Sequence, residues 1–239
     1  MNQSEVMNFL NEVAMQFPHA ISLASGRPNS RFFDKNKWQK YQDIFTLFYA
    51  QELEIDTIYA EKLLCQYGPS AGIINRILEK HLAIDESIHT NAENIIVTNG
   101  CQEALALLCL KLLKNNNDCM LTLDPSYIGF SGLINAIGKK VLAIEIDKVS
   151  HINDNNKRQF TWEYISTKVD ELKTNGLSPK AIYVNPDFNN PLSYRLNKNE
   201  RESLLNVCKQ LELILIEDNP YSRFNYSGVN ELSLKALYY

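Results

Sequence analysis

Short apolar segments alternate with amphipathic segments along most of the chain after residue 67. Five mainly apolar runs predict strands, at 94–100, 119–124, 140–147, 180–187 and 213–218. Between them, apolar residues recur at helical spacing and predict helices at 70–82, 101–114, 127–138, 161–176 and 197–212. Strands that are apolar along their whole length and alternate with helices are typical of a parallel sheet covered on both faces. The pattern therefore predicts an α/β fold with a mostly parallel sheet.

The first 60 residues lack this regular pattern and are expected to form an arm with short helices. Gly26 and Pro28 predict a loop within 21–33, and the polar segment 151–159 predicts another. We therefore expect a division of the chain into residues 1–60 and residues 61–239.

The composition narrows the class of protein. Of the 239 residues, 45% are hydrophobic and 22% are charged, and the net charge of −4 disfavours a nucleic-acid-binding surface. No apolar run approaches a membrane span and no secretory signal is visible at the N-terminus, so we expect a cytoplasmic protein. Five cysteines without a C-x-x-C pair predict reduced thiols, and four scattered histidines make a metal site improbable.

The first two predicted strands of the sheet end in residues that could bind a ligand, because parallel sheets bind ligands at the carboxyl ends of strands. Gly100 and the helix that starts near Cys101 offer free backbone N–H groups for a phosphate, although an ordinary strand–turn–helix joint is the simpler interpretation. Tyr127 follows the second strand and could stack on a flat ligand, although such a tyrosine is more often a core or rim residue.

The last two strands end in further polar residues. Asn190 precedes Pro191 in a segment with two Asn-Pro steps, which either aims an amide into a cleft or simply forms a turn. Asp218 and Tyr221 follow the apolar run Leu213–Ile216, and a carboxylate in a partly buried cleft requires a cationic partner such as a protonated pyridine nitrogen. Together these strand ends describe a flat heterocycle with a phosphate, a ring nitrogen and a ring oxygen, which is pyridoxal phosphate.

Six segments that carry these residues resemble the class I/II aminotransferases of fold type I, especially the branch with kynurenine/2-aminoadipate aminotransferases and the effector domains of MocR-type regulators. The segments are ISLASGRPNSRFF, QYGPSAGIINRILEKHL, NIIVTNGCQEALALLCLKLL, LDPSYIGF, AIYVNPDFNNPLSY and LILIEDNPYSRFNYSG. The resemblance implies that residues 61–239 form a pyridoxal-phosphate-binding large domain that is incomplete, lacking the C-terminal strands and the small domain. Residues 1–60 would then be an N-terminal arm and part of the small domain.

The resemblance assigns eight positions to the cofactor: Tyr67, Gly100, Cys101, Gln102, Tyr127, Asn190, Asp218 and Tyr221. Asp218 would pair with the ring nitrogen, Tyr221 and Asn190 would bind the ring oxygen, and Tyr127 would stack on the ring. The backbone of 100–102 would bind the phosphate, and Tyr67 would reach the phosphate of a neighbouring subunit's cofactor, which implies a homodimer. Arg27 and Asn190 would approach the substrate, although an exposed loop arginine is the commoner interpretation of Arg27.

The resemblance places the family's aldimine-forming lysine in a Ser-x-x-Lys motif beyond residue 239, so no catalytic lysine is expected within the chain. Lys235 is interpreted as a surface lysine. The expected function is amino-group transfer from an amino acid to a 2-oxo acid, by a homodimer or with a complementing C-terminal chain. Three alternatives stay open: a non-catalytic pseudoenzyme or split subunit, a decarboxylase or oxidase with the same cofactor, and a MocR-type regulatory domain.

Overall fold

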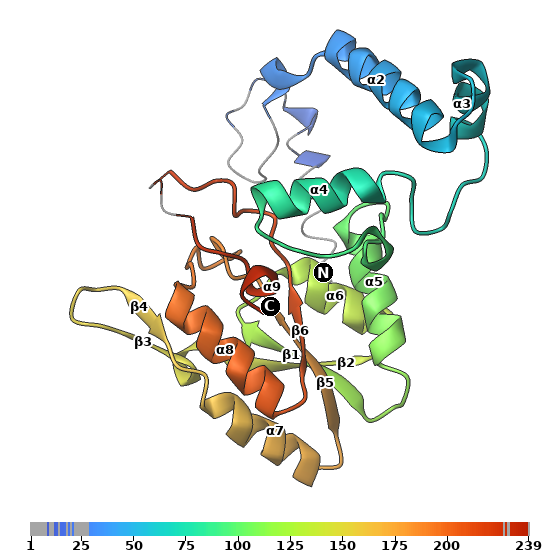
Figure 1. Ribbon diagram of the computed structural model, residues 1–239. Coiled ribbons are helices and arrows are strands. Elements are labelled where there is room, and N and C mark those ends of the chain that lie inside the picture. The colour runs from blue at the N-terminus through green and yellow to red at the C-terminus, as the bar shows by residue number, and fades with distance from the viewer. Residues whose placement is uncertain are drawn as a thin grey trace. The chain divides into compact units, whose positions relative to one another are not determined.

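The computed structural model describes residues 29–226, 228 and 230–238, and before them residues 9, 12, 13, 15–17, 19 and 21 (Figure 1). The chain packs as two compact units. The first contains Met1–Arg76 and Ile95–Val97, and the second contains Ile77–Asn94 and Thr98–Tyr239. The division expected near residue 60 stays a prediction.

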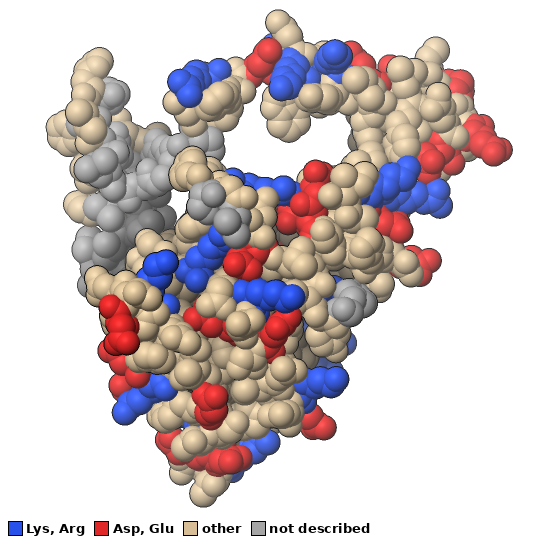
Figure 2. Space-filling model, turned by 60° about the vertical axis from the view of Figure 1, so that its left-hand side comes forward, with Lys and Arg blue, Asp and Glu red and all other residues tan. Residues whose placement is uncertain are grey.

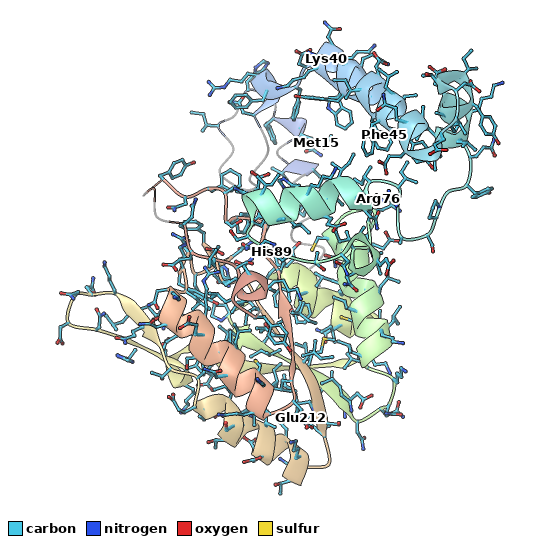
Figure 3. All side chains as sticks on the ribbon, in the orientation of Figure 1. Met15, Lys40, Phe45, Arg76, His89 and Glu212 are labelled. Carbon is cyan, nitrogen blue, oxygen red and sulfur yellow. The ribbon has the colours of Figure 1, made fainter. Side chains whose placement is uncertain are left out.

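The first unit contains η1 (Ser30–Phe32), α2 (Lys35–Leu53) and α3 (Thr57–Leu64). Because α2 has 19 residues, the expectation of only short helices in this part is wrong. Asp34 caps the start of α2, where its Oδ1 accepts a hydrogen bond of 2.9 Å from the Asn36 N–H. Phe45, labelled in Figure 3, lies one turn before Tyr49, and the two rings stack with centroids 5.8 Å apart. The capped start and the aromatic contact stabilise a helix that apolar periodicity did not reveal.

The segment 94–100 is not a strand, which corrects the prediction made from its apolar run. It follows η2 (Ala92–Asn94) and has no regular structure before α5. The Asn75 side-chain N–H₂ donates to the Ile95 carbonyl at 2.5 Å, and the Val97 N–H donates to the Ala71 carbonyl at 2.9 Å. These backbone groups are therefore satisfied by the first residue of α4 (Asn75–Asp85) and by the segment before it, instead of by a sheet.

The second unit is built on a parallel sheet with the strand order β2-β1-β5-β6. Its strands are β1 (Asp118–Asp124), β2 (Lys140–Glu145), β5 (Ser178–Val184) and β6 (Ile214–Glu217). Four of the five predicted strands are thereby confirmed, as is the α/β class.

Side chains alternate between the two faces of this sheet, and helices cover both faces (Figure 1). Met120 and Tyr183 pack with α5 (Cys101–Leu112) and α6 (Ile128–Ala136). Leu121 and Ile182 pack on the opposite face with α7 (Tyr164–Thr174) and α8 (Lys198–Gln210). Both layers exclude water from the sheet, so its polar chemistry is confined to the strand ends.

The polar segment 151–159 is an antiparallel hairpin, not the loop expected from its composition. It joins β3 (Ser150–Ile152) to β4 (Arg158–Phe160) after η3 (Ile146–Lys148). Asn153 Oδ1 accepts hydrogen bonds from the N–H groups of Asn155 and Lys157, at 3.1 and 3.0 Å. This side chain closes the turn, so two short polar strands pair without an apolar pattern.

Asn197 begins α8 as the sequence predicts, and it does so in a capping box with Glu200. The Glu200 side chain also accepts a hydrogen bond of 2.9 Å from the Phe160 N–H. The main-chain carbonyl of Glu200 accepts a hydrogen bond of 2.8 Å from Trp162 Nε1. The start of α8 is thereby tied to the segment that follows the hairpin.

A buried ionic cluster joins β6, α8 and the segment after β5. Asp187 Oδ1 accepts from Arg201 Nη2 at 2.7 Å and from Arg195 Nε at 2.9 Å. Arg201 and Asp187 are fully buried, and Arg201 Nη1 lies 4.0 Å from Glu217 Oε1. Glu217 in turn accepts hydrogen bonds from the N–H groups that begin α9 (Leu234–Leu237). Buried charges persist only when they are paired in this way.

The ionic cluster generates a stability prediction. Arg201→Ala leaves the buried Asp187 carboxylate with Arg195 as its remaining partner, so we expect the free energy of unfolding to fall by about 3–5 kcal/mol. Urea unfolding measures this change. Lys198→Ala on the same helix is the control, because Lys198 is exposed and its ion pair with Glu202 is at 3.6 Å. Equal, small losses in the two variants would show that the cluster does not stabilise the fold.

Candidate functional site

A cleft of about 220 Å³ lies at the carboxyl edge of the sheet, entirely within the second unit. It is lined by Cys101, Gln102, Leu105, Tyr127, Asn185, Asn190, Asp218, Pro220 and Tyr221. The structure therefore brings together six of the side chains singled out in the sequence, from segments more than 100 residues apart. Gly100 directly precedes this group. Tyr67 belongs to the first unit, and Arg27 lies outside the described residues.

The adjacent acids at the end of β6 serve different environments. Glu217 turns away from the cleft, and its carboxylate accepts from the backbone N–H groups of Leu234 and Lys235 at 2.9 and 3.0 Å. Asp218 is the next residue and lines the cleft. Because successive side chains of an extended segment point to opposite sides, one acid supports the fold while the other is available to a ligand.

Three neighbours hold Asp218 in place. The Tyr183 hydroxyl donates to Asp218 Oδ2, and the Asn185 side-chain N–H₂ donates to the Asp218 carbonyl at 2.9 Å. The Cys101 thiol lies 3.7 Å from Asp218 Oδ1 and is a weak donor. Partial burial, followed by the Asp218 charge, raises the pKa of the Cys101 thiol above its usual range. Cys101 is therefore a thiol beside the carboxylate, not an activated nucleophile.

The start of α5 faces the cleft through Cys101 and Gln102. Gly100 is its N-cap with φ of 83°, a conformation that favours glycine, and no side chain caps this helix start. The preceding turn is held because the Asn99 N–H donates to Glu103 Oε2 at 2.6 Å. An uncapped helix start has N–H groups and a partial positive charge to offer to an anion.

Tyr127 is held at the start of α6 by close packing with Gly129. A Cβ atom at Gly129 would overlap the Tyr127 ring, so only glycine permits this ring position. The Gln102 side-chain N–H₂ donates to the Gly129 carbonyl at 3.0 Å and joins the starts of the two helices. Burial and the nearby charge of Asp218 raise the pKa of the Tyr127 hydroxyl, which therefore stays neutral. The ring forms one wall of the cleft.

The two remaining walls are loops held by hydrogen bonds within the second unit. The Asn190 loop is closed by the Asn189 N–H, which donates to the Tyr194 carbonyl at 2.9 Å. The loop with Tyr221 is anchored by Arg223, which pairs with Glu86 at 2.7 Å. Asn190 and Tyr221 can therefore approach a ligand without ordering a free loop first.

The sequence analysis missed Tyr183 and Asn185. Tyr183 lies inside an apolar strand, where its hydroxyl gave no signal. Asn185 lies inside the predicted strand 180–187, and it follows the strand only because β5 ends earlier, at Val184. Its side-chain oxygen is buried with no hydrogen-bond partner among the described residues. Its N–H₂ donates to the Asp218 carbonyl.

These features fit pyridoxal phosphate in the chemistry of their groups. A carboxylate suits a protonated ring nitrogen, an aromatic wall suits a flat ring, and an uncapped helix start suits a phosphate. Asn185 lines this cleft, and its side-chain oxygen is a buried polar atom without a hydrogen-bond partner among the described residues.

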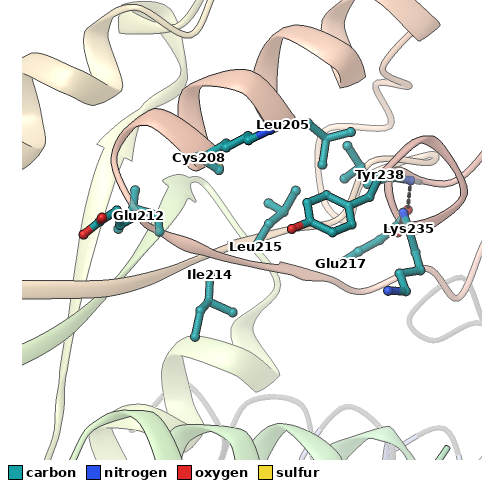
Figure 4. A pocket seen from close by; sticks show the side chains of 11 residues that line it. Leu205, Cys208, Glu212, Ile214, Leu215, Glu217, Lys235 and Tyr238 are labelled. Atoms are coloured by element: carbon teal, nitrogen blue, oxygen red, sulfur yellow. Dashed lines mark hydrogen bonds between the residues drawn. The ribbon is translucent and has the colours of Figure 1, made fainter. Parts of the chain in front are cut away.

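A larger groove of about 450 Å³ lies between α8, β6 and α9 (Figure 4). Its lining is mainly apolar and includes Leu205, Leu215 and Tyr238. Lys235 lines this groove, and none of the described residues lining the cleft at the carboxyl edge is a lysine. We place the candidate site in the smaller cleft, because it gathers a carboxylate, amides and an aromatic ring.

The described residues outside the cleft were compared for charge, metal-binding groups and membrane-spanning helices. In the face seen in Figure 2, Lys and Arg side chains are interspersed with Asp and Glu. Among the residues that the structure describes, no group of His, Cys, Asp and Glu side chains is arranged to hold a metal ion. No described helix has the length and apolar character needed to cross a membrane.

Comparison with known proteins gives consistent matches. Residues 49–235 match the family Aminotransferase class I and II. The (S)-3,5-dihydroxyphenylglycine transaminase of Amycolatopsis orientalis is 32% identical over 231 residues, which are 97% of this chain and 50% of that protein. The mitochondrial kynurenine/alpha-aminoadipate aminotransferase of Rattus norvegicus is 24% identical over 211 residues, covering 84% of this chain and 47% of that protein.

Solved structures agree with the sequence matches. The kynurenine aminotransferase of Pyrococcus horikoshii has a TM-score of 0.71 and 29% identity, covering 99% of this chain and 53% of its own. An archaeal alanine:glyoxylate aminotransferase has a TM-score of 0.73 and 25% identity, covering 99% of this chain and 54% of its own. The chain spans about half the length of these relatives.

The fold is that of the large domain of fold type I transferases, with a parallel sheet between helices and a polar cleft at its carboxyl edge. The chain belongs to the class I and II aminotransferase family.

Thiol labelling tests the placement of Cys101. Cys65 and Cys101 are exposed, whereas Cys109, Cys119 and Cys208 are buried, and burial raises the pKa of Cys208 to about 12. We expect native protein to be alkylated at Cys65 and, more slowly, at Cys101, because the pKa of Cys101 is raised. Iodoacetamide labelling followed by peptide mapping measures both rates. Labelling of Cys208 as fast as Cys65 without denaturant would contradict the packing of α8.

Glu217 generates a pH prediction. Burial raises its pKa above the ordinary 4.5, outweighing the lowering by backbone N–H groups and Arg201. Between pH 4.5 and the raised pKa, Glu217 keeps its proton in the folded protein but has lost it in the unfolded chain. The contribution of Glu217 to the free energy of unfolding is therefore full below pH 4.5 and is lost as the pH rises through the raised pKa. We expect Glu217→Gln to become more stable relative to wild type as the pH rises from 4.5 toward neutral, measured by urea unfolding.

Glu212→Gln is the control for that measurement, because Glu212 is an exposed carboxylate on the rim of the same groove. Its stability difference from wild type should not follow the same course with pH. A Glu217→Gln difference that is constant with pH would show that Glu217 has the same pKa in the folded and unfolded states.

Proposed function

We propose that this chain supplies the cofactor cleft of a pyridoxal-phosphate-dependent aminotransferase, which transfers an amino group from an amino acid to a 2-oxo acid. The observation that carries the proposal is the Asp218 carboxylate, held at the carboxyl edge of the sheet and open to the cleft. Family membership supports the same conclusion.

Each wall of the cleft has a defined task in this proposal. Asp218 accepts a hydrogen bond from the protonated ring nitrogen and keeps the proton on that atom. Asn190 and Tyr221 donate to the ring oxygen, and Tyr127 covers one side of the ring. The backbone N–H groups of 100–102 bind the phosphate at the start of α5.

The bound cofactor would act as an electron sink, which stabilises negative charge at the substrate carbon. Asp218 makes this sink effective, because its charge favours the protonated ring nitrogen. The Pyrococcus horikoshii relative was crystallised in complex with PMP, with KYN as substrates and KYA as products. That protein supports a cofactor of the same chemical type here.

The proposal includes a homodimer with shared sites. Tyr67 is fully exposed in the first unit, with its hydroxyl available to a cofactor phosphate in a partner subunit. Arg27 and Asn190 are proposed to approach the substrate.

Substitution of Asp218 tests the proposal. Asp218→Asn keeps the acceptor for the Tyr183 hydroxyl but removes the charge, so we expect the dissociation constant for pyridoxamine 5′-phosphate to rise at least about tenfold. This ligand cannot condense with surface lysines, and calorimetry measures its binding. Asp118→Asn is the matched control, since Asp118 is a paired carboxylate at the opposite end of a strand.

Cys101 gives an independent readout in the same samples. A ligand in the cleft should slow alkylation of Cys101 and leave Cys65 unaffected, because Cys65 belongs to the first unit. Equal affinity in wild type and Asp218→Asn, or binding without protection of Cys101, would overturn the proposal.

A further inference from the structure

Tyr183 is a buried tyrosine whose hydroxyl reaches the cleft carboxylate. It lies in β5 with 1% of its surface exposed, and its hydroxyl donates to Asp218 Oδ2. Its ring stacks on Phe130 of α6, with centroids 3.9 Å apart and planes at 10°. The ring therefore cannot swing away, and the hydroxyl is fixed where the carboxylate needs it.

Asn185 holds the main chain of the same residue. Its side-chain N–H₂ donates to the Asp218 carbonyl at 2.9 Å, and the Asp218 N–H donates to the Val184 carbonyl at 3.0 Å. Three consecutive residues at the end of β5 thus contact Asp218: Tyr183 through its hydroxyl, Val184 through its main-chain carbonyl and Asn185 through its side-chain amide. Both the main chain and the side chain of Asp218 are restrained by one strand end.

This arrangement leaves one carboxylate oxygen for a ligand. Oδ2 is occupied by Tyr183, and the neighbour of Oδ1 is the Cys101 thiol at 3.7 Å, which is a weak donor. A ligand N–H can displace a thiol contact far more easily than a hydroxyl contact. A carboxylate whose rotation is already restrained also loses less conformational entropy when a ligand binds.

We propose that Tyr183 and Asn185 are positioning residues that direct Oδ1 of Asp218 into the cleft to receive the charged N–H of a heterocyclic ligand. This inference rests on the proposed function and deepens it. Burial and the hydrogen bond to Asp218 raise the pKa of Tyr183, so its hydroxyl keeps the proton and remains the donor.

A purely structural role for Tyr183 makes a different prediction. If the hydroxyl only satisfies a buried polar group, its loss weakens binding of every ligand in the cleft to the same extent. If it positions Asp218, its loss weakens only ligands that carry the ring N–H. The two roles are separated by comparing pyridoxamine 5′-phosphate with its 1-deaza analogue, in which carbon replaces the ring nitrogen.

The experiment measures both dissociation constants by calorimetry for wild type, Tyr183→Phe and Asn185→Ala. We expect wild type to prefer the nitrogen-containing ligand, and Tyr183→Phe to reduce that preference about tenfold, equivalent to about 1.4 kcal/mol. Phe keeps the stacking on Phe130. Tyr164→Phe is the matched control, because Tyr164 is a partly buried tyrosine at the start of α7 that packs in the other core layer. It should leave the preference unchanged.

A preference in Tyr183→Phe equal to that of wild type overturns the positioning role while leaving the proposed function intact. If Tyr183→Phe fails to fold, Asn185→Ala carries the test, and an unchanged preference there overturns the inference. A wild-type protein that binds neither ligand overturns the proposed function and this inference with it. Wild-type binding of both ligands with equal affinity shows that Asp218 does not pair with the ring nitrogen, which also overturns both.

Discussion

The parallel pairing of β5 with β6 is the constraint on which the cleft depends. Its register places Tyr183 beside Ile216 and Val184 beside Glu217, so the residues that follow both strands emerge together at one edge. A shift of one residue would turn Asp218 into the apolar layer beneath α8 and bring Glu217 to the cleft. The ladder hydrogen bonds therefore determine which of the two adjacent acids lines the cleft.

The ionic cluster behind the sheet makes the same register costly to change. Arg201 is fully buried and reaches both Asp187 after β5 and Glu217 at the end of β6. Moving either strand end would separate Arg201 from one carboxylate and leave a buried charge without its partner. The loops that carry Asn190 and Tyr221 thus start from strand ends held by charge pairs on the side away from the cleft.

Much of this architecture could be predicted from the sequence, because apolar runs reveal buried strands and polar residues after them reveal the functional edge. That rule found Tyr127, Asn190 and Asp218 without any knowledge of contacts. It failed for segment 94–100, whose backbone forms hydrogen bonds with residues 71 and 75. An apolar run predicts burial but does not reveal which segment its backbone will hydrogen-bond. The rule also failed for Tyr183, because a tyrosine inside a strand looks the same whether its hydroxyl is unused or holds a carboxylate.

The division of labour between Glu217 and Asp218 follows from their surroundings. Glu217 lies where burial raises its pKa and where backbone N–H groups of α9 occupy both oxygens, so it has little capacity left for a ligand. Asp218 has one oxygen held by a neutral hydroxyl and the other beside a weak thiol donor. The Asp218 carboxylate therefore has no cationic partner among these neighbours. A cationic N–H group in the cleft would supply the missing partner, and on the proposed function this is the physical basis for recognition of a protonated heterocycle.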